Sequence, residues 1–219
     1  MRAHSASLPL SSPPDSLCIL RLSAIGDISH TLPILRTIQH AWPTTRISWI
    51  IGKTEYELVK DIEGVEFIIF DKKRGLKGYL DIRRMLKGRH FDLLLHMQMS
   101  IRSSLISFLI DSPIKLGFDR ARAKDYQWLF TNHQIEARQR EHVIDSFFGF
   151  TDAIGISDRV LEWNIPIPKE AQRYAEQQLP RGDKYLVISP CSSMAYRNWL
   201  PERYAAVADY AMEQLGYRV

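Results

Sequence analysis

A single carboxylate stands in the first turn of the chain. The apolar run 17–22 predicts a strand, and it leads through Ser23 and Gly26 to Asp27, where a helix should begin. Aspartate at such a position commonly caps a helix by accepting backbone N–H bonds. Open α/β folds also bind their ligands at the carboxyl edge of a parallel sheet, where the same carboxylate can act as a general base. The residues alone leave both interpretations open.

The turn itself restricts the chemistry. It fits neither G-x-G-x-x-G nor G-x-x-x-x-G-K-[ST], which disfavours a dinucleotide-dependent dehydrogenase and a P-loop nucleotidase. The helix dipole stabilises the charge of Asp27, which makes this carboxylate a weak base in water. It can still take a proton from an alcohol while the alcohol oxygen bonds to an electrophilic carbon. We therefore expect a strongly activated electrophile, such as a sugar carbon that carries a diphosphate.

Residues 71–90 form a basic stretch, with eight Lys or Arg against two Asp, whereas the formal charge of the whole chain is +4. Such a local field attracts the phosphates of nucleic acids, lipid head groups or phosphorylated saccharides. A solvated helix face is the structural alternative. The sequence has no zinc-finger or helix-turn-helix signature and no RNA-recognition pattern of basic and aromatic residues, so nucleic acid is not an expected partner.

Short apolar runs alternate with helical patterns along residues 17–155. The near-continuous hydrophobicity of the runs indicates strands that are buried on both faces. The alternation predicts a parallel sheet with right-handed crossovers, which is a Rossmann-like α/β fold. The expected strands are 17–22, 46–51, 65–70, 91–97 and 114–118. The expected helices are 31–41, with Pro33 in its first turn, 53–62, 76–87, 101–110 and 139–154, which we expect to be the longest.

The remaining segments divide the chain. Residues 1–16 lack the long apolar stretch of a secretory signal and are expected to form a disordered leader. After a linker over 156–168, a second alternation gives a helix over 169–179, a strand over 185–189 and a helix over 201–215. These elements cannot bury a sheet of their own, so we expect the second unit to be incomplete as given. The two cysteines fit a reducing compartment, and we expect a cytoplasmic protein.

The string S-x-x-G-D-I-S-H-T-L-P over 23–33 resembles the N-terminal signature of bacterial lipopolysaccharide heptosyltransferases, which form glycosyltransferase family 9. Similar segments follow in the order of that family at 96–98, 114–125, 140–155 and 188–207. The similarity runs from about Leu17 to Val219 and is specific in combination. It implies the GT-B arrangement of two Rossmann-like domains. Residues 17–155 would bind the acceptor, and the domain that begins at residue 169 would bind the sugar nucleotide.

The resemblance implies that Asp27 is the base that deprotonates an acceptor hydroxyl. The hydroxyl would attack the anomeric carbon of an ADP-activated heptose with inversion, and ADP would leave without help from a cofactor or a metal. The sequence contains no D-x-D motif, and its histidines lack the spacing of metal ligands. The loop before the helix 201–215, with Ser192, Ser193 and Arg197, would hold the diphosphate of the donor.

The acceptor that the resemblance implies is a phosphorylated, anionic core saccharide on a lipid, which gives the basic stretch a purpose. Gln98 follows the end of a strand, and we expect it to make a fixed hydrogen bond. We also expect peripheral contact with the inner face of the inner membrane. The expected acceptor-binding residues are Ser23, Gly26, Lys72, Lys73, Arg74, Lys77, Gln98, Arg102, Arg120 and Arg122.

Family members continue well beyond the length of this sequence, so the resemblance predicts an incomplete transferase whose activity belongs to a longer chain. A non-catalytic domain that binds anionic saccharides through the basic stretch is the alternative. It predicts that Asp27→Asn leaves acceptor binding nearly intact and that a longer chain also fails to transfer sugar.

Overall fold

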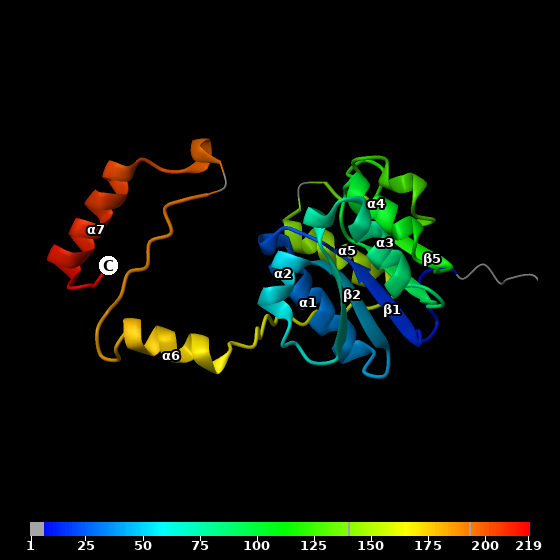
Figure 1. Cartoon of the computed structure of the whole chain (residues 1–219), viewed down its shortest axis with the longest axis horizontal. Helices are drawn as coiled ribbons and strands as arrows, with labels where there is room; N and C mark the ends of the chain where they lie inside the picture. Colours follow the sequence, from blue (N-terminus) through cyan, green and yellow to red (C-terminus); the bar gives the residue numbers. More distant parts are fainter. Residues whose placement is uncertain (1–6, 140, 193) are drawn as a thin grey trace, which may run out of the picture. The chain divides into compact units, whose positions relative to one another are not determined.

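The computed structural model describes residues 7–139, 141–192 and 194–219. The chain forms two compact units, Met1–Pro166 and Ile167–Val219, which we call unit 1 and unit 2 (Figure 1). Unit 1 contains the β-sheet and two hydrophobic clusters. Unit 2 contains two α-helices, which are joined by chain with little regular structure.

A six-stranded sheet forms the centre of unit 1. Its strands are β1 Ser16–Leu20, β2 Arg46–Gly52, β3 Val65–Phe70, β4 Leu93–His96, β5 Ile114–Gly117 and β6 His133–Gln134. All neighbours pair in parallel, in the order β3-β2-β1-β4-β5-β6. The five predicted strands are therefore confirmed, and β6 escaped prediction because two polar residues make no apolar run. The strand order reverses between β1 and β4, and open α/β sheets bind ligands in the crevice above such a point.

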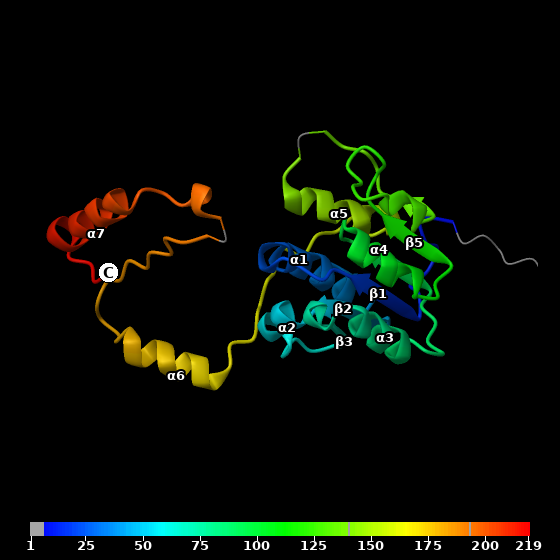
Figure 2. The ribbon, with the colours of Figure 1, turned by 45° about the horizontal axis from the view of Figure 1, so that its top comes forward.

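Helices cover both faces of this sheet. Leu17 and Ile19 of β1 lie in one hydrophobic cluster with α1 (Ile25–Ala41) and α5 (Val143–Ile154), two helices that lie side by side (Figure 2). Cys18 and Leu20 lie in a second cluster with α3 (Leu76–Met85) and α4 (Ile101–Phe108). Successive side chains of a strand point to opposite faces, so burial on both faces explains the continuous apolar runs.

The start of α1 differs from the prediction. The helix begins at Ile25 and not at Thr31, so Pro33 lies in its interior and not in its first turn. A proline inside a helix costs about 3 kcal/mol. Ile28, Leu32 and other apolar residues of α1 are fully buried, and this burial outweighs the cost of the ring.

The longest helix was also predicted wrongly. Among the described residues it is α1, with 17 residues, whereas α5 has 12. α5 begins at Val143, and not at residue 139, because His142 caps it. The Nδ1 atom of His142 accepts the backbone N–H of Ile144 at 3.2 Å. The predicted end at Gly155 is confirmed by its left-handed conformation, with φ 96°.

The expected disordered leader over 1–16 is wrong for its described part. Leu8 and Leu10 pack against the cluster of α1 and α5, and the Leu10 N–H donates to the Ile154 carbonyl at 3.3 Å. Ser16 is already the first residue of β1. The polar composition of this segment gave no sign that Leu8 and Leu10 pack against the core. Residues 1–6 lie outside the described part of the chain.

Unit 2 contains α6 (Lys169–Gln178) and α7 (Pro201–Leu215). The predicted bounds of α7 are confirmed, and Gly216 ends the helix in the left-handed conformation. The predicted strand 185–189 is absent, and a single parallel bridge joins Tyr185 to Arg218 instead. A strand needs neighbours that pair along its length. Of the described residues of unit 2, only Ala211 is buried, so this unit has no hydrophobic core comparable to that of unit 1.

Candidate functional site

The candidate site lies at the carboxyl edge of the sheet, where the segments after β1 and β4 meet. The N–H of Met97 donates to the Leu20 carbonyl at 3.1 Å, which brings these two segments together. The turn after β1 then enters α1 with Ala24 as its N-cap residue, and Asp27 follows in the first helical turn. The sheet topology thus places Asp27 at the edge where its sequence position predicted it.

Asp27 caps the start of α1 and also stays partly exposed at the edge of the sheet. One carboxylate oxygen, Oδ2, accepts the N–H of Ala24 at 3.3 Å, which is a weak cap at the start of α1. The same oxygen forms an ion pair with the guanidinium of Arg21. These are the polar contacts of its side chain within the described part of the chain, and 38% of that side chain is exposed. The carboxylate is therefore held through Oδ2, while the side chain as a whole stays partly exposed.

Arg21 is the partner that the sequence reasoning missed. Its side chain is 8% exposed, its Nη1 donates to the Met97 carbonyl, and its guanidinium lies 5.2 Å from the centre of the Phe147 ring. Burial lowers the pKa of Arg21, and the charge of Asp27 opposes that shift. Arg21 lies inside the apolar run that predicts β1, so nothing about its sequence position indicates a role beside Asp27.

Gln98 makes the fixed hydrogen bonds that were expected of a residue after β4, but it makes them to the turn after β1. Its Oε1 accepts the N–H of Leu22 at 2.6 Å and that of Ser23 at 3.3 Å. Its Nε2 donates to the Ser23 hydroxyl at 3.3 Å. These bonds fix the turn that leads to Asp27. Gln98 thus positions the site from within the protein.

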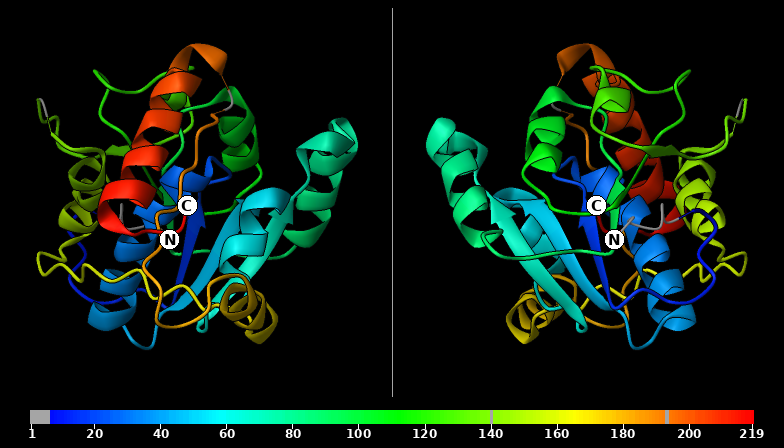
Figure 3. Two further views of the ribbon diagram at one scale, coloured as in Figure 1. Left: turned by 90° about the vertical axis from the view of Figure 1, so that its left-hand side faces the viewer. Right: turned by 90° about the vertical axis from the view of Figure 1, so that its right-hand side faces the viewer.

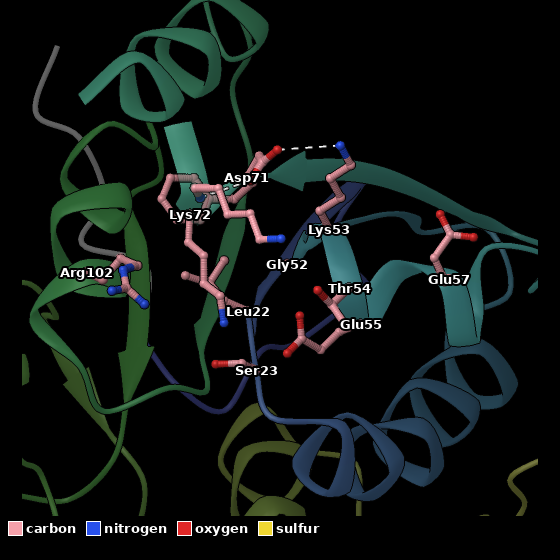
Figure 4. A pocket seen from close by; sticks show the side chains of 12 residues that line it. Leu22, Ser23, Gly52, Lys53, Thr54, Glu55, Glu57, Asp71, Lys72 and Arg102 are labelled. Atoms are coloured by element: carbon pink, nitrogen blue, oxygen red, sulfur yellow. Dashed lines mark hydrogen bonds and ion pairs between the residues drawn. The ribbon is translucent and has the colours of Figure 1, made fainter. Parts of the chain in front are cut away.

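A pocket of about 430 Å³ opens beside this turn (Figure 4). Four of the expected acceptor-binding residues line it, namely Ser23, Lys72, Lys73 and Arg102. The structure adds residues at the start of α2 (Lys53–Val59) that the sequence reasoning did not select. These are Lys53, Thr54 and Glu55. The pocket therefore draws its polar groups from the ends of several strands.

The other expected acceptor-binding residues lie outside this pocket. Arg74 pairs with Asp81, Lys77 is exposed on α3, and Arg120 lies 5.0 Å from the centre of the Trp128 ring. Gly26 is exposed in the first turn of α1, where an added Cβ would meet no atom within 4 Å.

Arg122 is engaged in a network of its own. It pairs with Asp119 and Glu141, and it donates to the Ser146 hydroxyl at 2.7 Å and to the Glu136 carbonyl at 2.9 Å. Its side chain is 23% exposed. With these partners the guanidinium ties the 119–122 turn to the segment before α5, and it offers few donors to a ligand.

Gly52 closes the end of β2 at the pocket wall. Its N–H donates to the Leu22 carbonyl at 3.0 Å, so the two segments approach closely. A Cβ at this position would lie 2.4 Å from the Leu22 oxygen and 2.4 Å from Oε2 of Glu55. Close approach, and not backbone conformation, requires glycine here, because φ is −69°.

The residues expected to hold the donor lie in unit 2. The Ser192 N–H donates to Oδ1 of Asn198 at 2.7 Å, and the Ser192 hydroxyl donates to the Met194 carbonyl at 2.8 Å. These bonds fold the loop before α7. Arg197 is exposed and lies 5.4 Å from the centre of the Tyr196 ring. Ser193 lies outside the described residues.

No group of three or more His, Cys, Asp or Glu residues in the described part of the chain could hold a metal ion. None of the described helices combines the length and the apolar character that crossing a bilayer requires.

Comparison with known proteins identifies the family. The model of glycosyltransferase family 9 (heptosyltransferase) matches residues 79–219, more than half of the chain. The chain belongs to glycosyltransferase family 9. The lipopolysaccharide core heptosyltransferase OpsX of Haemophilus influenzae is 42% identical to this family 9 chain over 198 residues. The match covers 90% of the chain but 57% of OpsX, so the chain spans little more than half the length of this relative.

Solved structures share the fold of this family 9 chain. The glycosyl transferase family 9 protein of Veillonella parvula matches with a TM-score of 0.79 at 22% identity, over 93% of this chain and 61% of that one. The heptosyltransferase WaaC of Escherichia coli, solved with ADP, matches with a TM-score of 0.72 at 19% identity. This match covers 93% of this chain and 66% of WaaC. The predicted Rossmann-like α/β fold of GT-B type is thereby confirmed.

Proposed function

We propose that this family 9 chain contributes the acceptor side and the catalytic base of a glycosyltransferase that moves heptose from ADP-heptose to the inner core of lipopolysaccharide. The observation that carries the proposal is Asp27, a partly exposed carboxylate at the carboxyl edge of the sheet, in the first turn of α1 and four residues after Ser23, which lines the pocket. Family membership and the printed activity of OpsX support the class of donor and acceptor.

In the proposed reaction, Asp27 takes the proton from an acceptor hydroxyl as its oxygen bonds to the anomeric carbon of the donor. The bond between that carbon and the diphosphate breaks, ADP leaves, and the configuration at the carbon inverts. Arg21 fixes Oδ2 of Asp27, which leaves Oδ1 to receive the proton. The loop before α7, with Ser192, Ser193 and Arg197, is proposed to stabilise the charge of the departing ADP.

The test is a transfer assay with ADP-heptose and a phosphorylated, lipid-linked acceptor, for the 219-residue chain and for the longest protein that carries it. Asp27→Asn should lower kcat at least about 100-fold, because loss of a general base costs that much. Acceptor affinity should remain nearly unchanged. Transfer by Asp27→Asn at close to the unsubstituted rate would overturn the proposed mechanism. Acceptor binding without transfer by any of these proteins would favour the alternative, a saccharide-binding domain.

We also propose that unit 1 contacts an anionic membrane surface through α3. This helix stands at the outer edge of unit 1 next to β3 (Figure 3). Leu76 is 82% exposed and Leu80 is 55% exposed, and the same helix carries exposed basic residues, namely Lys77, Arg83 and Arg84. Apolar and basic residues on one exposed helix suit the surface of an anionic bilayer. Lys72 and Lys73 line the pocket just before α3, so a lipid-linked saccharide could reach the pocket from that surface.

Vesicle binding tests this contact. The protein should sediment with phosphatidylglycerol vesicles and much less with neutral phosphatidylcholine vesicles. Leu76→Ser combined with Leu80→Ser should reduce the bound fraction severalfold while the fold is retained. Equal binding to both kinds of vesicle, or no effect of the two substitutions, would contradict the proposal.

A further inference from the structure

The pocket beside the turn after β1 has two chemically different walls. Lys72, Lys73 and Arg102 supply three positive charges from the segments after β3 and β4. The start of α2 supplies Glu55, whose carboxylate points from the helix into the space between Ser23 and Lys72 (Figure 4). The start of α2 also supplies Lys53, whose charge is paired with Asp71. A ligand in this pocket therefore meets the three cations on one side and the Glu55 carboxylate on the other.

The Glu55 side chain is largely buried, but its carboxylate remains open to the pocket, and no protein group in the described part of the chain pairs with it. The residue is 8% exposed, and its Oε2 lies against Gly52, where an added Cβ would approach it to 2.4 Å. Across the described part of the chain it makes no hydrogen bond within 3.5 Å and no ion pair within 4.0 Å. An ionised carboxylate only accepts hydrogen bonds, so one that faces a pocket without a protein partner offers its oxygens to a ligand that donates hydrogen bonds.

The other acidic residues of the pocket differ from Glu55 in this respect. Glu57 pairs with Lys60 at 2.9 Å. Asp71 accepts the N–H of Lys73 at 2.9 Å and pairs with Lys53 at 3.5 Å. Protein groups thus already satisfy these two carboxylates. Glu55 is the acidic group of the described pocket that remains available to a ligand.

We propose that Glu55 determines the specificity and orientation of the acceptor, by accepting hydrogen bonds from its sugar hydroxyls while Lys72, Lys73 and Arg102 bind its anionic group. The inference rests on the proposed function and deepens it. A fully ionised phosphate or carboxylate has no proton to donate and is repelled by Glu55. A saccharide that carries both hydroxyls and an anionic group fits both walls in a single orientation. That orientation turns its hydroxyl-bearing face toward α2.

Calorimetric titration of the 219-residue chain tests this assignment without any donor. The probes are a delipidated, phosphorylated inner-core saccharide, the same saccharide with its hydroxyls O-methylated, and inorganic phosphate. Glu55→Gln should weaken the unmodified saccharide about 10- to 100-fold, because hydrogen bonds to charged groups contribute that much. The affinity for inorganic phosphate should stay the same or rise. Glu63→Gln is the matched control, since it removes an exposed carboxylate outside the pocket and should change neither affinity.

The O-methylated saccharide tests the inference on the unsubstituted chain, without relying on Glu55→Gln alone. The unsubstituted chain should bind it about 10- to 100-fold more weakly than the natural saccharide, whereas Glu55→Gln should distinguish the two probes little. Equal affinity of Glu55→Gln and the unsubstituted chain for the natural saccharide would overturn the inference. A saccharide affinity no better than that for inorganic phosphate would overturn it too. Transfer that is lost in Asp27→Asn but normal in Glu55→Gln would reject this inference alone and leave the proposed function intact.

Discussion

Asp27 and Arg21 depend on one another for charge compensation. Arg21 is 8% exposed, so removing the carboxylate of Asp27 leaves a buried cation with one carbonyl partner. We predict that Asp27→Asn lowers the free energy of unfolding by about 1–3 kcal/mol, in addition to its effect on transfer. Arg21→Met should cost a similar amount. Urea unfolding of the purified protein measures both values.

The double variant separates the two effects of Asp27. Arg21→Met combined with Asp27→Asn removes both charges together, so it should be more stable than the sum of the single losses predicts, by about 0.5–3 kcal/mol. Transfer should nevertheless remain absent, because the base is missing. Additive losses of stability would show that the ion pair contributes nothing. Recovery of transfer in the double variant would mean that Asp27 acts only through the stability of the turn.

The sequence revealed part of this site. Asp27 could be selected because it directly follows an apolar run and one glycine, at a position where a helix begins. Arg21 and Glu55 could not, since the first lies inside an apolar run and the second lies on an ordinary amphipathic helix. Arg21 matters because it is buried against Asp27, and Glu55 matters because it faces the pocket without a protein partner. Both surroundings form only when segments far apart in the sequence meet.

The junction between β2 and α2 supports the pocket at the scale of elements. A Cβ on Gly52 would lie 2.4 Å from the Leu22 carbonyl oxygen, and this oxygen is held in the hydrogen bond between the two segments. We predict that Gly52→Ala lowers the free energy of unfolding by about 1–3 kcal/mol, as overpacking of a close contact does. Gly26→Ala is the matched control. Its Cβ would meet nothing within 4 Å, and alanine favours a helix, so stability should stay the same or rise by up to about 1 kcal/mol.

Elements were predictable where one physical signal dominated. The five longer strands followed from apolar runs, because burial on both faces leaves no other pattern. The start of α1 did not follow, since Pro33 suggested a first helical turn and so a helix over 31–41. Packing of α1 on the sheet decided that boundary. The predicted strand at 185–189 failed for the opposite reason, because an apolar run forms a strand only where neighbours pair with it.

At the scale of the molecule, unit 1 has the features of a complete α/β layer structure, and unit 2 does not. The sheet of unit 1 is covered on both faces, whereas apolar side chains such as Val187 and Tyr196 of unit 2 are 76% and 73% exposed. Stability measured on this chain therefore reports mainly on unit 1. The acid response of unit 1 should depend on a titratable group in its centre, and that group is His96 at the end of β4.

Burial of His96, which is 0% exposed, lowers its pKa from 6.5 to about 3, and the charge of Lys115 lowers it further in the same direction. Between these two values the unfolded chain binds a proton that the folded chain does not. The stability that comes from keeping His96 neutral is therefore present at neutral pH and is lost as the pH falls below 6.5. The free energy of unfolding should fall by up to about 1.4 kcal/mol per pH unit in this range. Urea unfolding across this pH range measures the slope of the free energy of unfolding against pH, and this slope should be shallower for His96→Leu. His40→Gln is the control. It replaces an exposed histidine and should keep the slope of the unsubstituted chain. Equal slopes for His96→Leu and the unsubstituted chain would mean that His96 gains a proton in the folded state as readily as in the unfolded state, and that solvent reaches the end of β4.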